Sequence, residues 1–396
     1  MARFALLALP LVFALSACAD RWTPPAGVFP ILGWVNPPKS FESAERYQEM
    51  ADAGFTIVHH CSDTSGPLAK GAGMHFFMHL GVPDPAEEAG RKRIEEMVAK
   101  WKDDSHCVGY DLMDEPNAGR FPALAAVTRA VESLDPKAVC FINLFPNYAN
   151  AEQLGAPTYA EHVEQYMTQV RPKVLCFDHY PLVGPTAVRG NYYENLEIIR
   201  AAALKHDTPF WAFALTCPHG PYRNPTEAEV RFQVFSDIVY GAQGIFYFTY
   251  WTPVDAHWGF HNAIIEVDGT RTEHYERVTR INAKLKAWGP TLLKLTSDEV
   301  RHTGNIPAGT RAYPADMATG GDFIVGEFTH ADGSKWVMVM NRDFTSTRTL
   351  SLNLPGITAL RELWETGELL GPITSPDSLF ELSVDAGDAA LYRIGG

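Results

Sequence analysis

The feature that most constrains the fold is an alternation, repeated eight times, of short apolar runs and amphipathic segments between residues 28 and 295. The amphipathic segments, such as residues 121–135, carry apolar side chains at three- and four-residue spacing, which is typical of helices. The apolar runs predict strands at 29–34, 56–60, 75–80, 107–113, 139–144, 174–179, 210–215 and 244–250. Eight strand–helix units close into a parallel (β/α)8 barrel, a TIM barrel.

The pattern changes at about residue 296. Short alternating runs such as DFIVGEF and KWVMVMNR follow, separated by turn signals at Asp332-Gly333 and Pro355-Gly356. This pattern predicts a small antiparallel β-sandwich domain over 296–396. We expect it to pack against the barrel, with sugar binding as the alternative role.

The N-terminal segment is typical of a secretory signal. Arg3 precedes an apolar run from Phe4 to Leu15, which is too short to span a bilayer. The following Leu-Ser-Ala-Cys resembles the bacterial lipobox, in which the cysteine becomes the lipidated first residue. We therefore expect a lipoprotein signal peptide at 1–18, a lipid anchor on Cys18, a tether at 19–27 and a place in the periplasm or at the outer membrane. Ordinary signal cleavage nearby is the alternative.

Composition narrows the class of partner. The formal net charge is −14 and no basic run is present, which argues against nucleic acid and against a polybasic membrane contact. Aromatic residues make up 12% of the chain, and flat apolar side chains at strand ends suit a neutral carbohydrate. No Cys-x-x-Cys spacing suggests zinc, so no cofactor is expected. A bridge between Cys61 and Cys217 stays open, and the oligomeric state is not predicted.

The stretch CVGYDLMDEPN, residues 107–117, is typical of an active site. An apolar strand ends abruptly in Asp114 and Glu115, and the carboxyl ends of barrel strands are where side chains reach substrate. Because Pro116 biases its predecessor toward an extended backbone, we expect Glu115 at the last extended position of the strand. The alternative is a strand that ends in a solvated acidic turn.

The other strand ends supply the remaining groups that glycoside hydrolysis needs. That reaction requires a protonated carboxyl, a second carboxylate and platforms on which sugars stack. Asp178 is the candidate second carboxylate, with a structural role in orienting His179 or a tyrosine as its alternative. Core packing is the alternative for Trp211 and Trp251. The candidate substrate-binding residues are Asp114, Trp34, His79, Asn143, His179, Tyr180, Trp211, Tyr250 and Trp251.

These motifs resemble a clan of (β/α)8 glycoside hydrolases that includes β-galactosidases, cellulases and mannanases. In that clan the fourth strand ends in Asn-Glu-Pro or a close variant, and the eighth strand ends near a tryptophan, as in YFTYW here. The phrases DEPN, INLFPNYA, DHYP, NLEIIR and GIFYFTYWTP also look like bacterial β-galactosidase-like lipoproteins. The resemblance implies that Glu115 is the general acid/base and that Asp114 contacts the sugar.

The chain departs from this clan at the seventh strand. The clan has its nucleophile there, a glutamate, but PFWAFALTCPHG contains no carboxylate. Asp178 is the nearest substitute, as nucleophile or as general base, and its distance from Glu115 around the barrel favours inversion. Further candidates in the loop after the eighth strand are Asp255, Glu266 and Asp268.

Two other function classes stay open. The missing carboxylate motivates a carbohydrate-binding protein on a degenerate hydrolase barrel. Histidines at strand ends motivate a metal-dependent hydrolase, although the first strand, LGWVNPP, lacks the His-x-His of amidohydrolase-like barrels. We therefore expect hydrogen bonds to sugar hydroxyls rather than a metal from these histidines, which are His59, His60, His75, His79 and His179.

Overall fold

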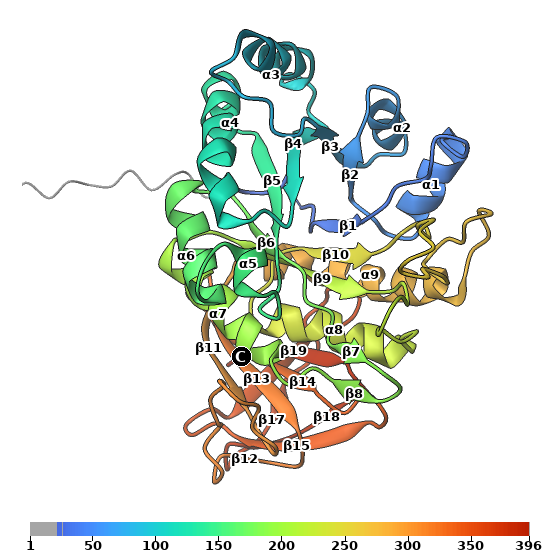
Figure 1. The fold of residues 1–396 in the computed structure, drawn as a ribbon. Helices are drawn as coiled ribbons and strands as arrows, with labels where there is room; N and C mark the ends of the chain where they lie inside the picture. Colours follow the sequence, from blue (N-terminus) through green and yellow to red (C-terminus); the bar gives the residue numbers. More distant parts are fainter. Residues whose placement is uncertain (1–21, 26, 396) are drawn as a thin grey trace, which may run out of the picture.

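Eight parallel strands form a closed barrel, as the sequence predicts (Figure 1). The computed structural model describes residues 22–25 and 27–395, so the predicted signal peptide and Cys18 lie outside the described residues. Around the barrel the strand order is β1-β10-β9-β6-β5-β4-β3-β2. The strands are β1 Ile31–Gly33, β2 Ile57–Cys61, β3 His75–His79, β4 Cys107–Asp114, β5 Val139–Leu144, β6 Leu175–Phe177, β9 Phe210–Leu215 and β10 Ile245–Phe248.

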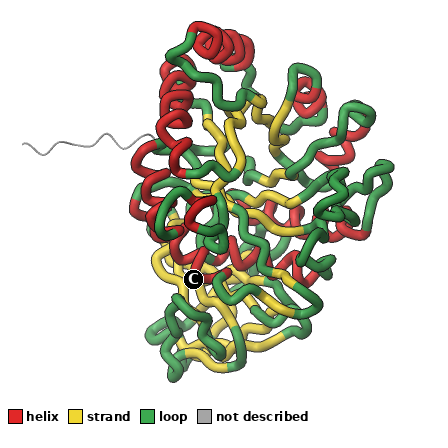
Figure 2. The backbone as a smooth tube through the Cα atoms, in the orientation of Figure 1, coloured by secondary structure: helices red, strands yellow, loops and turns green. Residues whose placement is uncertain are grey.

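Helices connect and cover the strands (Figure 2). Capping residues set where helices start. Helix α8 begins with a capping box, in which the Thr226 side chain accepts a hydrogen bond from the backbone N–H of Glu229. The Glu229 side chain in turn accepts one from the backbone N–H of Thr226. A two-stranded hairpin, β7 Leu182–Val183 with β8 Ala187–Val188, lies in the loop after β6. The helices are α1 Ala44–Asp52, α2 Ser65–Gly71, α3 Glu88–Trp101, η1 Ala118–Arg120, α4 Phe121–Leu134, α5 Ala151–Leu154, α6 Tyr159–Gln169, α7 Tyr192–Lys205, α8 Glu227–Val239 and α9 Glu273–Leu292.

The barrel interior is filled by apolar side chains, so it is a packed core and not a channel. Trp211 on β9 is fully buried there. Its ring contacts Trp22, which precedes the barrel, at 5.6 Å between centroids, and it also contacts Phe77 and Phe141. Trp22, in the segment predicted as a tether, therefore packs against the barrel interior.

The C-terminal part consists of two antiparallel sheets, which confirms the predicted β-sandwich (Figure 1). Only two residues, Leu293 and Lys294, separate helix α9 from strand β11, which starts at Leu295. Helix α8 lies against β13 and β14 of the larger sheet. That sheet holds β11 Leu295–His302, β13 Phe323–His330, β14 Lys335–Asn341, β19 Ala389–Ile394, β16 Ala359–Leu363 and β17 Ile373–Thr374; the smaller holds β12 Ala318–Thr319, β15 Arg348–Asn353 and β18 Leu379–Val384.

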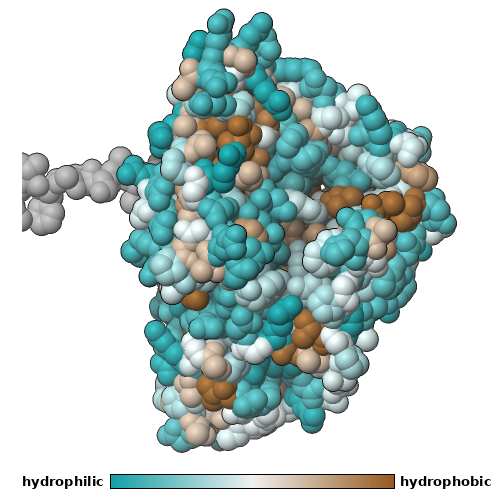
Figure 3. Space-filling view, viewed as in Figure 1, coloured by the Kyte–Doolittle hydropathy of each residue, from teal (hydrophilic) through white to brown (hydrophobic). Residues whose placement is uncertain are grey.

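The surface is mostly hydrophilic on the face seen in Figure 3, with separate hydrophobic clusters. Across residues 22–25 and 27–395, none of the helices has the length and hydrophobicity needed to cross a membrane. Cys61 and Cys217 are free and buried, so the bridge left open by the sequence is not formed.

Candidate active site

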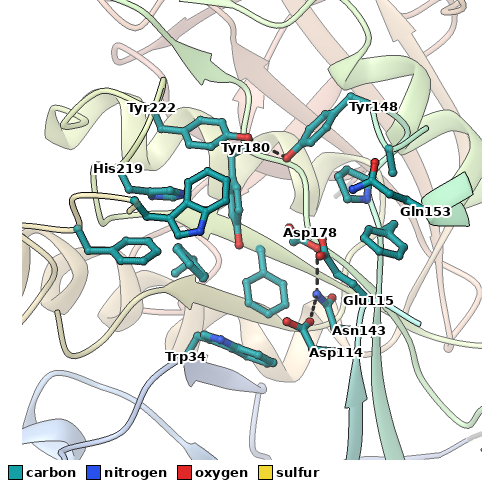
Figure 4. Close-up of a pocket in the computed structure, with 17 residues that line it drawn as sticks. Trp34, Asp114, Glu115, Asn143, Tyr148, Gln153, Asp178, Tyr180, His219 and Tyr222 are labelled. Atoms are coloured by element: carbon teal, nitrogen blue, oxygen red, sulfur yellow. Dashed lines mark hydrogen bonds between the residues drawn. The ribbon is translucent and has the colours of Figure 1, made fainter. Parts of the chain in front are cut away.

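A cavity of about 420 Å³ opens at the carboxyl ends of the barrel strands (Figure 4). Six of the predicted site residues line it: Trp34, Asp114, Glu115, Asn143, Asp178 and Tyr180. They come from the ends of β1, β4, β5 and β6. Strands β4, β5 and β6 are neighbours in the barrel, and β1 lies elsewhere in it. Parallel strands thus bring residues far apart in sequence to one edge of the barrel.

Glu115 has a left-handed backbone conformation, with φ at +41°. The expectation that it occupies an extended position is therefore wrong, and β4 ends one residue earlier, at Asp114. Pro116 disfavours the right-handed helical region for Glu115. The backbone N–H of Glu115 still donates to the carbonyl of Asn143 at 2.8 Å. A non-glycine residue held in a sparsely populated region costs on the order of 1 kcal/mol and is common at functional sites.

Asn143 connects two of the carboxylates. Its Nδ2 donates to Asp114 Oδ1 at 3.0 Å and to Asp178 Oδ1 at 2.9 Å (Figure 4). Both amide hydrogens are used in this way, which fixes the orientation of the Asn143 side chain and of both acids. Asp178 is buried, whereas Asp114 is exposed to the cavity.

The carboxyls of Glu115 and Asp178 both line the cavity, and each affects the pKa of the other. Burial and the charge of Asp114 raise the pKa of Glu115 to about 7, although the interaction with Asp178 acts in the opposite direction. Burial and the nearby carboxylates Glu115 and Asp114 raise the pKa of Asp178 well above its usual value. The pair therefore holds a proton near neutral pH.

The placement of these two carboxyls bears on the stereochemistry expected from the sequence. An inverting pair is separated by about 6.5–9.5 Å, which leaves room for water, and a retaining pair by about 5 Å. Only β5 lies between β4 and β6 in the barrel, so one strand separates the two carboxyls, and their distance around the barrel does not by itself favour inversion.

Aromatic side chains form much of the cavity wall, and several come from loops (Figure 4). His219 packs against Tyr222, Phe248 and Phe260 with ring centroids 4.7–5.2 Å apart. The loop residues are not indicated by the sequence because their loops have no periodic pattern, and only their position after strand ends points to them. Phe213 on β9 and Phe248 on β10 are hidden for another reason, since their strands are apolar throughout. The lining residues that the sequence does not indicate are Phe145, Pro146, Tyr148, Ala149, Gln153, Phe213, His219, Tyr222, Phe248, Trp258 and Phe260.

Three predicted stacking platforms do not line the cavity. Trp211 is sealed in the barrel interior, as described above. Tyr250 is fully buried and packs edge-on against Phe55. Trp251 is 2% exposed and packs against Phe41. For all three, burial in the core is the physical reason why the expected sugar contact is not made.

Two predicted histidines also lie outside the cavity lining. His179 is 1% exposed and packs between Tyr148 and Tyr192, and burial lowers its pKa to about 3, so the ring is neutral. His79 instead contacts the buried carboxylate of Asp111, with 2.9 Å between Nδ1 and Oδ2. His179 therefore supports Tyr148 from behind, and His79 belongs to a separate cluster.

The carboxylates after β10 have local structural roles. Asp255 accepts from the backbone N–H of His257, and Asp268 accepts from that of Thr270. Glu266 accepts from the backbone N–H of Asn262. None of the three acids is among the residues that line the cavity, so they do not replace the missing carboxylate of β9.

Comparisons with known proteins identify the fold. The sequence matches no family model and no curated protein. Among solved structures, a β-galactosidase from Bacillus circulans sp. alkalophilus is similar over 92% of this chain and 98% of its own, at 10% identity and a TM-score of 0.62. A glycoside hydrolase family 5 protein from Bacteroides vulgatus ATCC 8482 is similar over 93% and 89%, at 12% identity and a TM-score of 0.59. The chain thus has the fold of (β/α)8 glycoside hydrolases.

Proposed function

We propose that this protein is a glycoside hydrolase in which Glu115 is the general acid and Asp178 is the second carboxylate, acting as base or nucleophile. The observation that carries the proposal is the raised pKa of Glu115, about 7, in a cavity that it shares with Asp178. Cleavage of a glycosidic bond needs an acid that is still protonated near neutral pH, so that it can give its proton to the leaving oxygen. Glu115 meets this requirement.

The surrounding residues suit a carbohydrate. Asp114 and Asn143 present polar atoms to the cavity, and Trp34, Tyr180 and Trp258 present aromatic surface. Hydrogen bonds from the former and stacking on the latter are how sugar rings are held. The volume of about 420 Å³ is within the range of small-molecule pockets, and we propose oligosaccharides or glycan ends as substrates.

The test is hydrolysis of a panel of aryl glycosides and oligosaccharides by the protein and by Glu115→Gln. We expect the variant to lose activity by a factor of 100 or more, since general acid catalysis contributes about 10²–10⁴-fold. Glu152→Gln is the matched control, because Glu152 is exposed on α5 and does not line the cavity. Full activity in Glu115→Gln that disappears with a chelator would identify a metal-dependent hydrolase instead.

The first-formed anomer of the product assigns the role of Asp178. Retention identifies Asp178 as a nucleophile, and inversion identifies it as the base that activates water. Asp178→Asn is expected to lose activity in either case. Unchanged activity in this variant would remove Asp178 from the mechanism.

A second candidate function is a carbohydrate-binding protein without catalysis. The observation that favours it is β9, Phe210–Leu215, which carries no carboxylate at the position where the similar clan has its nucleophile. This candidate predicts that no glycoside of the panel is cleaved, while a glycan binds equally to the protein and to Glu115→Gln.

We also propose that Cys18 carries a lipid that anchors the protein in the periplasm or at the outer membrane of a bacterium. The support is the sequence Leu15-Ser16-Ala17-Cys18 after an apolar run. Radioactive palmitate should label the protein expressed in a bacterium and should not label Cys18→Ala. Equal labelling of both would refute the anchor.

A further inference from the structure

Three histidines converge on one buried carboxylate beside the cavity. Asp111 on β4 is 4% exposed. Its Oδ1 lies 2.9 Å from His59 Nε2, and its Oδ2 lies 2.8 Å from His60 Nδ1 and 2.9 Å from His79 Nδ1. The histidines come from the ends of β2 and β3, so neighbouring strands build the cluster.

The backbone of β2 is shaped so that two consecutive residues face the same point. Side chains of an ordinary strand alternate between its two sides, which would send His59 and His60 in opposite directions. Here the register of β2 against β3 shifts between Val58 and Cys61, and His60 has a left-handed φ of +56°. Bulges and strained residues of this kind re-aim side chains next to functional sites.

A second irregularity affects the carboxylate strand. The register of β4 against β5 shifts between Asp111 and Met113. Irregularities therefore flank both the histidine pair and Asp111. Anchoring one aspartate in a core needs no such arrangement, since a single imidazole or a backbone N–H supplies the hydrogen bond.

We propose that His59, His60, His79 and Asp111 form a binding site for a divalent transition-metal ion such as Zn²⁺. Imidazole nitrogen and carboxylate oxygen are the ligands that Zn²⁺ takes, most often four in number. This proposal is independent of the proposed glycosidase activity.

The spacing of the ligand atoms fits an ion of this kind. One ligand atom from each of His59, His60 and Asp111 lies within 4.8 Å of the others, and His79 lies beside this group, with its Nδ1 2.9 Å from Asp111 Oδ2. Ligands at about 2.0–2.2 Å from Zn²⁺ are at most about 4.4 Å apart, so small side-chain movements close the coordination sphere. Each ring must present a bare nitrogen, and its proton moves to the other ring nitrogen or to solvent.

The cluster is accessible to an ion and connected to the cavity. The His60 and His79 side chains are 56% and 41% exposed, whereas His59 is 3% exposed. The His59 ring stacks on Trp34, with 4.4 Å between centroids and 18° between planes. Because Trp34 lines the cavity, an ion held by His59 would fix an aromatic wall of the cavity without contacting the substrate.

The test is calorimetric titration with Zn²⁺ alone, on the untagged protein after dialysis against a chelator. We expect one ion per chain. His60→Asn removes a ligand while keeping a residue that tolerates a left-handed backbone, and His79→Gln removes another at a half-exposed position. Each should weaken binding by on the order of 100-fold, because even loss of a partner behind a ligand costs 10–100-fold.

His257→Ala is the matched control, since His257 is exposed on the loop after β10 and away from the cluster. It should bind Zn²⁺ as tightly as the unchanged protein. Circular dichroism of each variant checks that the fold is kept, and Co²⁺ binding gives a second readout through its visible absorption. Absence of stoichiometric binding, or equal affinity in the folded His60→Asn and His79→Gln variants, would overturn the proposal.

Discussion

The raised pKa of Glu115 predicts the pH dependence of hydrolysis. The protonated form is the active form of a general acid, so activity is lost as pH rises through the pKa of Glu115, about 7. At pH 7 a group with this pKa is about half protonated, whereas a glutamic acid at its ordinary value of 4.5 would be protonated to about 0.3%. The environment therefore supplies roughly 150 times more acid at pH 7.

The perturbation that tests this reasoning is Asp114→Asn. Burial is the largest cause of the raised pKa of Glu115, and the charge of Asp114 is the next. Removing that charge should move the basic limb of the kcat/KM profile down by roughly one pH unit, the effect of one close like charge. The assay is the profile from pH 4 to about 9 with an aryl glycoside that both proteins cleave.

The position of the limb separates this electrostatic effect from a lost sugar contact. Asp114 also faces the cavity, so its loss lowers the rate at every pH, but only a changed pKa of the acid moves the limb. Asp255→Asn is the control, because Asp255 holds a turn in the loop after β10. A limb that stays in place in Asp114→Asn, or moves up, would refute the account of Glu115.

Three further predictions concern binding and stability. Trp258→Ala should raise KM about tenfold with kcat nearly unchanged, because Trp258 lines the cavity, while Val254→Ala, 84% exposed on the same loop, should change neither. Trp211→Ala should lower the free energy of unfolding by about 3–5 kcal/mol without changing KM; a raised KM in the folded variant would place Trp211 at the substrate after all. Lys284→Ala should cost about 1–3 kcal/mol in chemical denaturation, because Asp388 loses the partner 2.8 Å away but keeps Arg231 at 3.6 Å, and Asp388→Asn in addition should restore part of the loss.

The sequence carries the fold in the periodicity of its apolar residues. Each barrel strand must be apolar because both of its faces are buried, and every predicted strand overlaps an observed one. Because every barrel strand is apolar, the sequence does not distinguish aromatic side chains that line the cavity from those buried in the core. Trp211 and Trp34 both come from apolar strands, yet one is sealed in the core and the other lines the cavity.

The carboxylates of the site could be predicted because they interrupt apolar patterns at strand ends. Asp178 and Glu115 are found in this way, and parallel strands bring them to one edge. The direction in which the Glu115 side chain leaves β4 depends on its left-handed backbone, which no local pattern indicates. The histidines His59, His60 and His79 are indicated by the sequence, but their convergence on Asp111 is not, because it depends on the irregular backbone of β2.

Helix α8 packs against both the barrel and the C-terminal sheet, so it determines whether the two parts can be produced separately. Ten of its 13 residues are buried, from Glu229 to Val239, because the barrel covers one side and the C-terminal sheet covers another. One apolar core accordingly includes Phe235 of this helix and Met338 and Met340 of β14. In a protein truncated after residue 294, the apolar side of α8 that packs against the sheet would be exposed to solvent. The barrel and the sheets behind it are thus one unit for expression, and truncation to the barrel alone should yield aggregates.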